Sequence, residues 1–310
     1  MPNRRPSNPR PLAPRLGYAF TTMHDMSAFT LSRSRSEVFV PDGIASAQAL
    51  SRTTHLAIGA HPDDLEIMAV HGILECLASE AQWFAGVIAT DGAGSPAVPG
   101  EPPASKEAIR EARRAEQKRA AELGRYGALV FLDHTSAEAK DPANDALARD
   151  LDAVLRATAP EVVYTHNLAD VHDTHVAVAL SVIAACRTLP SSERPRRVIG
   201  CEVWRDLDWL SAEAKVALPV DGHEELEGSL IRIFESQIRA GKRLDAGALG
   251  RRRANATFNE IREADAHEGI VWGMDLTRAA HGQIEPVDLL AEHLRVFETD
   301  VLARIRRFTR

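Results

Sequence analysis

The sequence has few cysteines, no excess of positive charge and no long apolar run. Its three cysteines, Cys76, Cys186 and Cys201, stand alone in apolar stretches, which predicts reduced core residues in a cytoplasmic protein rather than disulfides or a zinc–thiolate site. A net charge of −7 gives no electrostatic reason to expect nucleic-acid or anionic-membrane binding. No apolar stretch approaches the roughly 20 residues that a membrane-spanning helix needs.

Two nucleotide-binding signatures are also missing. The first expected strand is not followed by G-x-G-x-x-G, and the chain has no Walker-type loop, which disfavours a nucleotide-binding α/β protein.

Residues 1–30 are rich in Pro, Arg and Ser but lack the apolar segment of about 7 to 15 residues that a signal peptide needs. They predict a disordered tail, with Met26 as a rival start, ahead of a single domain over 31–310.

Apolar runs of strand length alternate with segments of helical period, which predicts parallel β-α units. No internal repeat or inner domain boundary interrupts them, and 241–310 is expected to be a substrate or lid region or an oligomerisation region. The expected strands are 54–60, 83–90, 127–132, 161–166, 197–203 and 215–220, and the expected helices are 64–80, 105–124, 144–158, 174–187 and 223–240.

The stretch AIGAHPDDLEIMAVHG, at 57–72, places a histidine and two adjacent aspartates where an expected strand gives way to a helix. Acids at a helix N-terminus are stabilised by its free N–H groups, so a helix cap is one interpretation. One aspartate would serve as a cap, whereas this stretch has His61, Asp63 and Asp64. Because His and Asp are both common metal ligands, the motif favours a metal or catalytic site.

A second polar cluster, THNLADVHDTH at 165–175, directly follows another expected buried strand. By itself it is equally compatible with a polar surface loop. His172 and His175 are three residues apart, so one helical turn would bring both to the same face. Ligands of an open parallel sheet gather outside the carboxyl ends of its strands. Two such clusters at one edge therefore predict a His/Asp/His site with an open position, as in a catalytic zinc centre.

A catalytic zinc would also give the remaining polar residues a use. One aspartate of the Asp63–Asp64 pair could bind the metal while its neighbour takes a proton from water. The histidine that is not a ligand could protonate a leaving amine or stabilise an oxyanion. This set of groups is suited to the hydrolysis of an amide.

AHPDDLE at 60–66 together with HDTH at 172–175 resembles the PIG-L/LmbE-like family of zinc-dependent N-acetylglucosaminyl deacetylases. The resemblance covers roughly 52–240. It implies a Rossmann-like α/β fold, with an open, mainly parallel sheet and helices on both faces. It also implies a zinc-dependent hydrolase that removes an N-acyl group, expected to be acetyl, from a small molecule containing an amino sugar.

The resemblance also implies roles for individual residues. His61, Asp64 and His175 match the Zn²⁺ ligands, Asp63 matches the general base, and His172 matches the residue that stabilises the oxyanion or acts as an acid. The family pattern has an acid directly before its last histidine, where this chain has Thr174. The partner that orients His172 would then be Asp170 or Asp173.

Substrate contacts are expected from four residues: Thr90, Asp91, Arg113 and Asp170. Thr90 and Asp91 belong to TDGAGSP, which resembles the loop after the family's second strand, although a Gly/Pro turn is the plain alternative. GRRRAN at 250–255 is usually a solvated face, or else a basic lid over an acidic or phosphorylated substrate. Two alternative functions stay open: an amidase acting on a thiol conjugate, or a sugar-binding protein without activity. A homo-oligomer is also compatible with the sequence.

Overall fold

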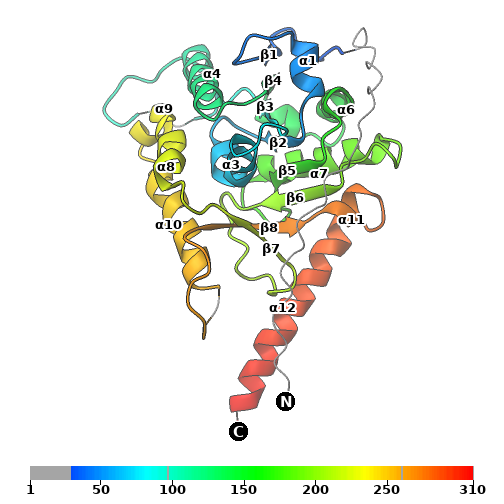
Figure 1. Ribbon diagram of the computed structural model, residues 1–310, viewed down its shortest axis with the longest axis vertical. Helices are drawn as coiled ribbons and strands as arrows, with labels where there is room; N and C mark the ends of the chain where they lie inside the picture. Colours follow the sequence, from blue (N-terminus) through cyan, green and yellow to red (C-terminus); the bar gives the residue numbers. More distant parts are fainter. Residues whose placement is uncertain (1–28, 96–97, 260, 310) are drawn as a thin grey trace.

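The computed structural model describes residues 29–95, 98–259 and 261–309 (Figure 1). Residues 1–28 of the expected tail lie outside the described residues. The described part contains one eight-stranded sheet with the order β1-β4-β3-β2-β5-β6-β8-β7. The strands are β1 Glu37–Phe39, β2 His55–Gly59, β3 Phe84–Thr90, β4 Ala128–His134, β5 Val162–His166, β6 Arg197–Cys201, β7 Lys215–Pro219 and β8 Ile270–Asp275.

The open, mainly parallel sheet expected from the sequence is confirmed. The five central strands, β4-β3-β2-β5-β6, run parallel, and all six expected strands are present. Two strands outside this parallel core differ from a purely parallel β-α pattern. β1 pairs antiparallel with β4, and β8 lies antiparallel between β6 and β7. β1 has only three residues, so it is too short to show the alternation of apolar and polar residues by which a strand is recognised in a sequence.

Helices cover both faces of the sheet, as expected. Successive residues of β2 point to opposite faces of the sheet. Leu56 and Ile58 belong to one buried apolar cluster, together with residues of α1, α6 and α7. Ala57 belongs to a second cluster on the other face, together with residues of α2 and α3. The helices are α1 Ser46–Ser51, α2 Asp64–Met68, α3 Val70–Leu77, α4 Lys106–Leu123, α5 Ser136–Ala139, α6 Ala146–Thr158, α7 Asp173–Thr188, α8 Glu224–Arg232, α9 Glu235–Arg239, α10 Leu244–Thr257, α11 Thr277–Ala280 and α12 Pro286–Phe308.

Strand β2 lies at the point where the strand order reverses. The chain passes from β2 to its neighbour β3 on one side, and later returns through β5 on the other side. A crevice opens outside the carboxyl ends of two such strands, and ligands of open α/β sheets bind there. The two polar clusters at 61–64 and 165–175 follow β2 and β5, so the topology brings them to this crevice.

One helix was expected over 64–80, but the chain forms α2 and α3 with a break at Ala69. The cause is Arg252 of α10, whose guanidinium donates to the carbonyl oxygens of Glu66 (2.7 Å) and Ile67 (3.1 Å). Arg252 also pairs with Glu227 at 2.5 Å, and both are buried. The interpretation of GRRRAN as a solvated face is therefore wrong for Arg252. Its partners, the Glu227 carboxylate and the two carbonyls of α2, are distant in the sequence, so the local pattern does not reveal them.

We expect Arg252→Met to cost about 3–5 kcal/mol of the free energy of unfolding, because it leaves the Glu227 carboxylate buried without a cation. The double variant Arg252→Met/Glu227→Met should recover much of this loss. Arg253→Met is the matched control, since Arg253 pairs with Glu224 at the surface and should cost less than about 1 kcal/mol. Urea unfolding measures all three. Equal costs for Arg252→Met and Arg253→Met would contradict this account.

The last helix, α12, projects from the body of the molecule (Figure 1). Only Leu289 near its start is fully buried, Leu290 is half-buried, and the apolar residues from Leu294 onward are exposed. Five of these lie at spacings of three and four and so form one stripe: Leu294, Phe297, Val301, Ile305 and Phe308. We call this set the α12 stripe. No helix in the described part of the chain has the length and apolarity to span a bilayer.

Candidate metal centre

Asp63 adopts a left-handed backbone conformation, with φ 99°, in the turn between β2 and α2. Such a conformation costs a non-glycine residue roughly 1–3 kcal/mol and needs support from its surroundings. The Asp63 N–H donates to Gln117 Oε1 at 3.0 Å, and Arg113 donates to the Pro62 carbonyl. Both supporting residues come from α4 and are buried.

This geometry disfavours the interpretation of Asp63 as a helix cap. The residue occupies the N-cap position of α2, but its side chain makes no capping hydrogen bond. Its carboxylate instead meets Arg113 at 3.0 Å and lines a pocket. Asp64 stabilises the same turn, because its Oδ2 accepts a hydrogen bond from the His61 main-chain N–H at 2.7 Å. The two neighbouring aspartates thus have different surroundings and can serve different purposes.

Glu66, whose residue type alone suggests only a first-turn acid, belongs to the scaffold of this turn. Its Oε1 accepts from the Tyr126 hydroxyl (2.6 Å) and from the Gln117 amide (2.7 Å). Gln117 therefore links Glu66 to the backbone of Asp63. Burial raises the pKa of Glu66 to about 8, so this carboxyl is mostly neutral at pH 7 and adds little negative charge to the site.

The second cluster is ordered by the start of α7. His172 is the N-cap residue, and its Nδ1 accepts from the Thr174 N–H at 3.3 Å. The proton of a neutral His172 ring then lies on Nε2. Asp170 contacts the His175 ring, with 3.4 Å between Oδ2 and Nδ1, and accepts from the His172 N–H at 3.0 Å. The ring of His172 is thus held by main chain, while the carboxylate of Asp170 holds His175.

The three expected ligands lie close together at the crevice. His61 Nδ1 lies 3.2 Å from His175 Nε2, and Asp64 lies 3.4 Å from His61 Nδ1 and 3.5 Å from His175 Nε2. Two imidazole nitrogens and a carboxylate form a donor set suited to a divalent ion such as zinc. The Asp170 contact to the opposite nitrogen of His175 is the partner that metal-binding histidines usually have. The residues present fit a metal ion.

His166, the last residue of β5, also lies in this cluster, although the motifs did not single it out as a site residue. Donor atoms of Asp64, His166 and His175 form one close group, and those of His61, His172 and His175 form another. His166 Nε2 accepts from the Ala60 N–H at 2.9 Å, so its lone pair is engaged by the backbone. Its ring stacks on that of His175, with 3.8 Å between centroids. These contacts support a positioning role for His166.

Burial and neighbouring charges separate the two aspartates electrostatically. Burial raises the pKa of Asp63 to about 7, although Arg113 opposes this shift. Burial would also raise the pKa of Asp64, but His175 and His166 outweigh it and hold that pKa well below its usual value. Asp64 is therefore an anion beside imidazole rings, while Asp63 can exchange a proton near neutral pH.

Four residues were expected to contact substrate, and the structure shows their bonds within the protein. The Thr90 hydroxyl donates to the Ala60 carbonyl, and Asp91 accepts from Arg110. Arg113 and Asp170 hold Asp63 and His175, as described above. Direct contact of these four side chains with a substrate stays a prediction, and their bonds support a role in shaping the turn and the site.

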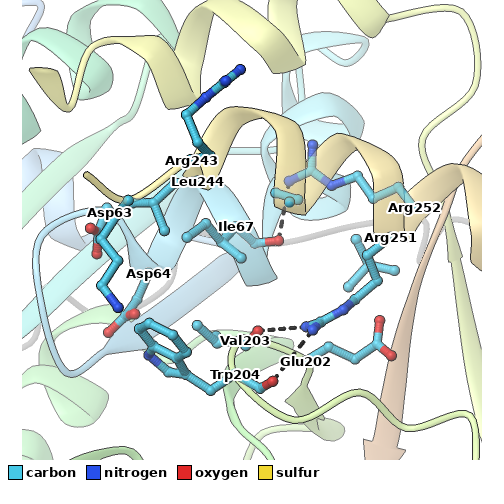
Figure 2. Close-up of a pocket in the computed structure, with 14 residues that line it drawn as sticks. Asp63, Asp64, Ile67, Glu202, Val203, Trp204, Arg243, Leu244, Arg251 and Arg252 are labelled. Carbon is cyan, nitrogen blue, oxygen red and sulfur yellow. Dashed lines mark hydrogen bonds between the residues drawn. The ribbon is translucent and has the colours of Figure 1, made fainter. Parts of the chain in front are cut away.

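A pocket of about 270 Å³ opens beside the candidate metal centre (Figure 2). Asp63 and Asp64 form one wall. The opposite wall comes from α10 and the loop before it, and the segment after β6 completes the enclosure with Glu202, Val203 and Trp204. No expected strand or helix was assigned over 241–260, yet part of this stretch lines the pocket. A substrate region there stays a prediction.

These features define an open α/β protein with a candidate metal centre at its topological switch point. Residues 56–186 match the family model described as PIG-L, GlcNAc-PI de-N-acetylase. This match confirms the resemblance to the PIG-L/LmbE-like deacetylases that the AHPDDLE and HDTH motifs indicated. The matched segment carries both motifs and ends within α7.

Known proteins resemble the chain over different lengths. An uncharacterized deacetylase of Escherichia coli K12, YaiS, is 29% identical over 155 residues, which are 49% of this chain and 77% of the relative. An N,N'-diacetylchitobiose deacetylase from Pyrococcus horikoshii has a TM-score of 0.53 at 19% identity, covering 71% of this chain and 83% of its own. The hydratase GalB from Pseudomonas putida has a TM-score of 0.54 at 17% identity, covering 72% and 96%. At 17% and 19% sequence identity, these two structural similarities show only a shared fold.

Proposed function

We propose that the protein is a zinc-dependent deacetylase that removes an N-acetyl group from a small molecule containing an amino sugar. The observation that carries this proposal is the convergence of His61, Asp64 and His175, with atoms 3.2–3.5 Å apart, beside a pocket that Asp63 also lines. We assign these three residues as the Zn²⁺ ligands. We also infer a cytoplasmic location, in keeping with three buried free cysteines; cell fractionation would test it.

The residues around the ligands divide the acid–base work of amide hydrolysis. A bound Zn²⁺ supplies a Lewis acid that acidifies water and polarises a carbonyl oxygen. Asp63, with a pKa of about 7, is suited to take a proton at its carboxylate and return it to the leaving amine. His172 has a pKa lowered by burial, so its neutral ring can donate from Nε2–H to the oxyanion. Arg113 keeps Asp63 in place.

The family and its relatives support the substrate class. The matching family is named for removal of an acetyl group from an N-acetylglucosaminyl lipid, and the Pyrococcus horikoshii protein is named for diacetylchitobiose. The pocket of about 270 Å³ is near the lower end of ligand-pocket sizes. It suits one sugar ring with a modest substituent better than a large glycopeptide.

Asp63→Asn tests the division of labour between the two aspartates. Asparagine tolerates the left-handed conformation, so the turn should persist while the base is lost. We expect kcat for amine release to fall about 10²–10⁴-fold, with about one zinc per chain retained. Asp64→Asn should lose zinc, and Asp173→Asn, at an exposed position, should change neither. Metal analysis and amine release from N-acetylglucosamine derivatives measure these effects.

Other results would redirect or overturn the proposal. Loss of zinc in Asp63→Asn, but not in Asp64→Asn, would contradict the roles assigned here. Amine release only from thiol conjugates would favour the amidase. Sugar binding without turnover by the zinc-loaded protein would favour a binding protein. The GalB hydratase shares the fold, so water addition without amine release would also overturn a deacetylase.

We further propose that the α12 stripe pairs with the same stripe of a second copy. Acids along α12 precede Arg304, Arg306 and Arg307, so an antiparallel pair would set acids beside arginines, whereas a parallel pair would set the arginines together. Light scattering should show a dimer, and Leu294→Glu/Val301→Glu should give a monomer. Val296→Glu is the control, because Val296 is exposed off the stripe. A monomeric native protein would contradict the pairing.

A further inference from the structure

The pocket beside the metal centre has walls of opposite chemical character. Asp63 and Asp64 lie on one side, and Arg251 and Arg252 of α10 lie across from them, with Trp204 along the lower edge of the view (Figure 2). Lys242, in the loop before α10, completes the basic side. This basic side comes from a stretch beyond residues 56–186, the part that the family match covers.

The acidic groups of the pocket are already balanced. Asp63 pairs with Arg113, and Asp64 lies within 3.5 Å of three imidazole rings. Glu202 accepts from the Leu207 N–H, the Trp272 N–H and the Asn255 amide. These donors occupy its carboxylate, and burial raises its pKa.

The cationic groups are not balanced in the same way. Arg252 is neutralised by Glu227, and Arg243 turns away from the pocket toward Asp245. Arg251 and Lys242 have no acidic partner within 4.0 Å in the described part of the chain. Arg251 uses two of its N–H groups on the carbonyls of Val203 and Trp204. A guanidinium has five N–H donors, so others remain for a ligand.

Trp204 connects the basic side to the metal centre. Its main-chain N–H donates to Asp170 Oδ2 at 3.2 Å, and the same carboxylate contacts His175. Trp204 is 43% exposed, and Lys242 Nζ lies 4.6 Å from the centroid of its ring. An exposed aromatic ring offers an apolar face to a sugar ring. The lysine above it would meet a charged substituent of that sugar.

We propose that this pocket binds an anionic group, a phosphate or a carboxylate, carried by the substrate beyond its N-acyl amine. Lys242 and Arg251 bind the anion, and Trp204 packs against the sugar between the anion and the metal centre. This inference rests on the proposed deacetylase function for the substrate, but the anion site is defined by its own residues. The preferred substrate is therefore an acidic N-acetylated amino sugar rather than a neutral one.

Calorimetric titration of the zinc-loaded protein tests the anion site without requiring turnover. The probes are N-acetylglucosamine, its 6-phosphate and N-acetylmuramic acid, which carries a carboxylate. We expect at least one acidic probe to bind about tenfold more tightly than the neutral sugar, since hydrogen bonds to charged groups are strong. Lys242→Glu should remove this preference. Lys140→Glu, the same charge change at an exposed lysine outside the pocket, should retain it.

The outcomes separate the two acidic groups and the two proposals. Tight binding of the phosphate probe alone identifies a phosphate site, and tight binding of the carboxylate probe alone identifies a carboxylate site. Equal binding of all three probes, or equal effects of Lys242→Glu and Lys140→Glu, would overturn the anion site. Amine release is measured on the same probes. A retained, Lys242-dependent preference without any amine release would support the anion site while the deacetylase proposal failed.

Discussion

The left-handed turn at Asp63 is the constraint on which the rest of the site depends. It directs two adjacent aspartates into different surroundings, one toward Arg113 and the other toward the histidines. A turn of this kind is strained in a non-glycine residue. Gln117 and Arg113 of α4 compensate by bonding the N–H and the carbonyl of the Pro62–Asp63 peptide group that enters the turn. The position of α4 against the turn is therefore part of the chemistry, although α4 supplies none of the expected metal ligands.

The crevice is assembled by segments that are distant in the sequence. β2 and β5 bring the two polar clusters together because the strand order reverses between them. α10 then closes the pocket, and its Arg252 binds the carbonyls of Glu66 and Ile67 in the last turn of α2. The same helix thus sets the length of α2 and forms the basic side of the pocket. Changes in α10 should consequently affect both stability and ligand preference.

Much of the fold follows from local sequence patterns, whereas the supports of the site do not. The six expected strands have apolar runs long enough to be recognised, and the HPDD and HDTH motifs mark the crevice. β1 is too short for a period, and the break at Ala69 depends on Arg252, which is 183 residues further along the chain. His166 ends a strand that is buried on both sides, so alternation could not distinguish it. Sequence motifs and hydrophobic periodicity do not predict such contacts between residues that are distant in the sequence.

The central claim is that one turn and one helix start hold His61, Asp64 and His175 as a single metal centre. A crystal structure of the zinc-loaded protein, with anomalous scattering recorded at the zinc edge, tests it most directly. We predict one strong peak in contact with His61 Nδ1, an Asp64 oxygen and His175 Nε2, with the Asp63 carboxylate nearby and unbound. A peak coordinated by His166 in place of His61, or no peak in this crevice, would contradict the account.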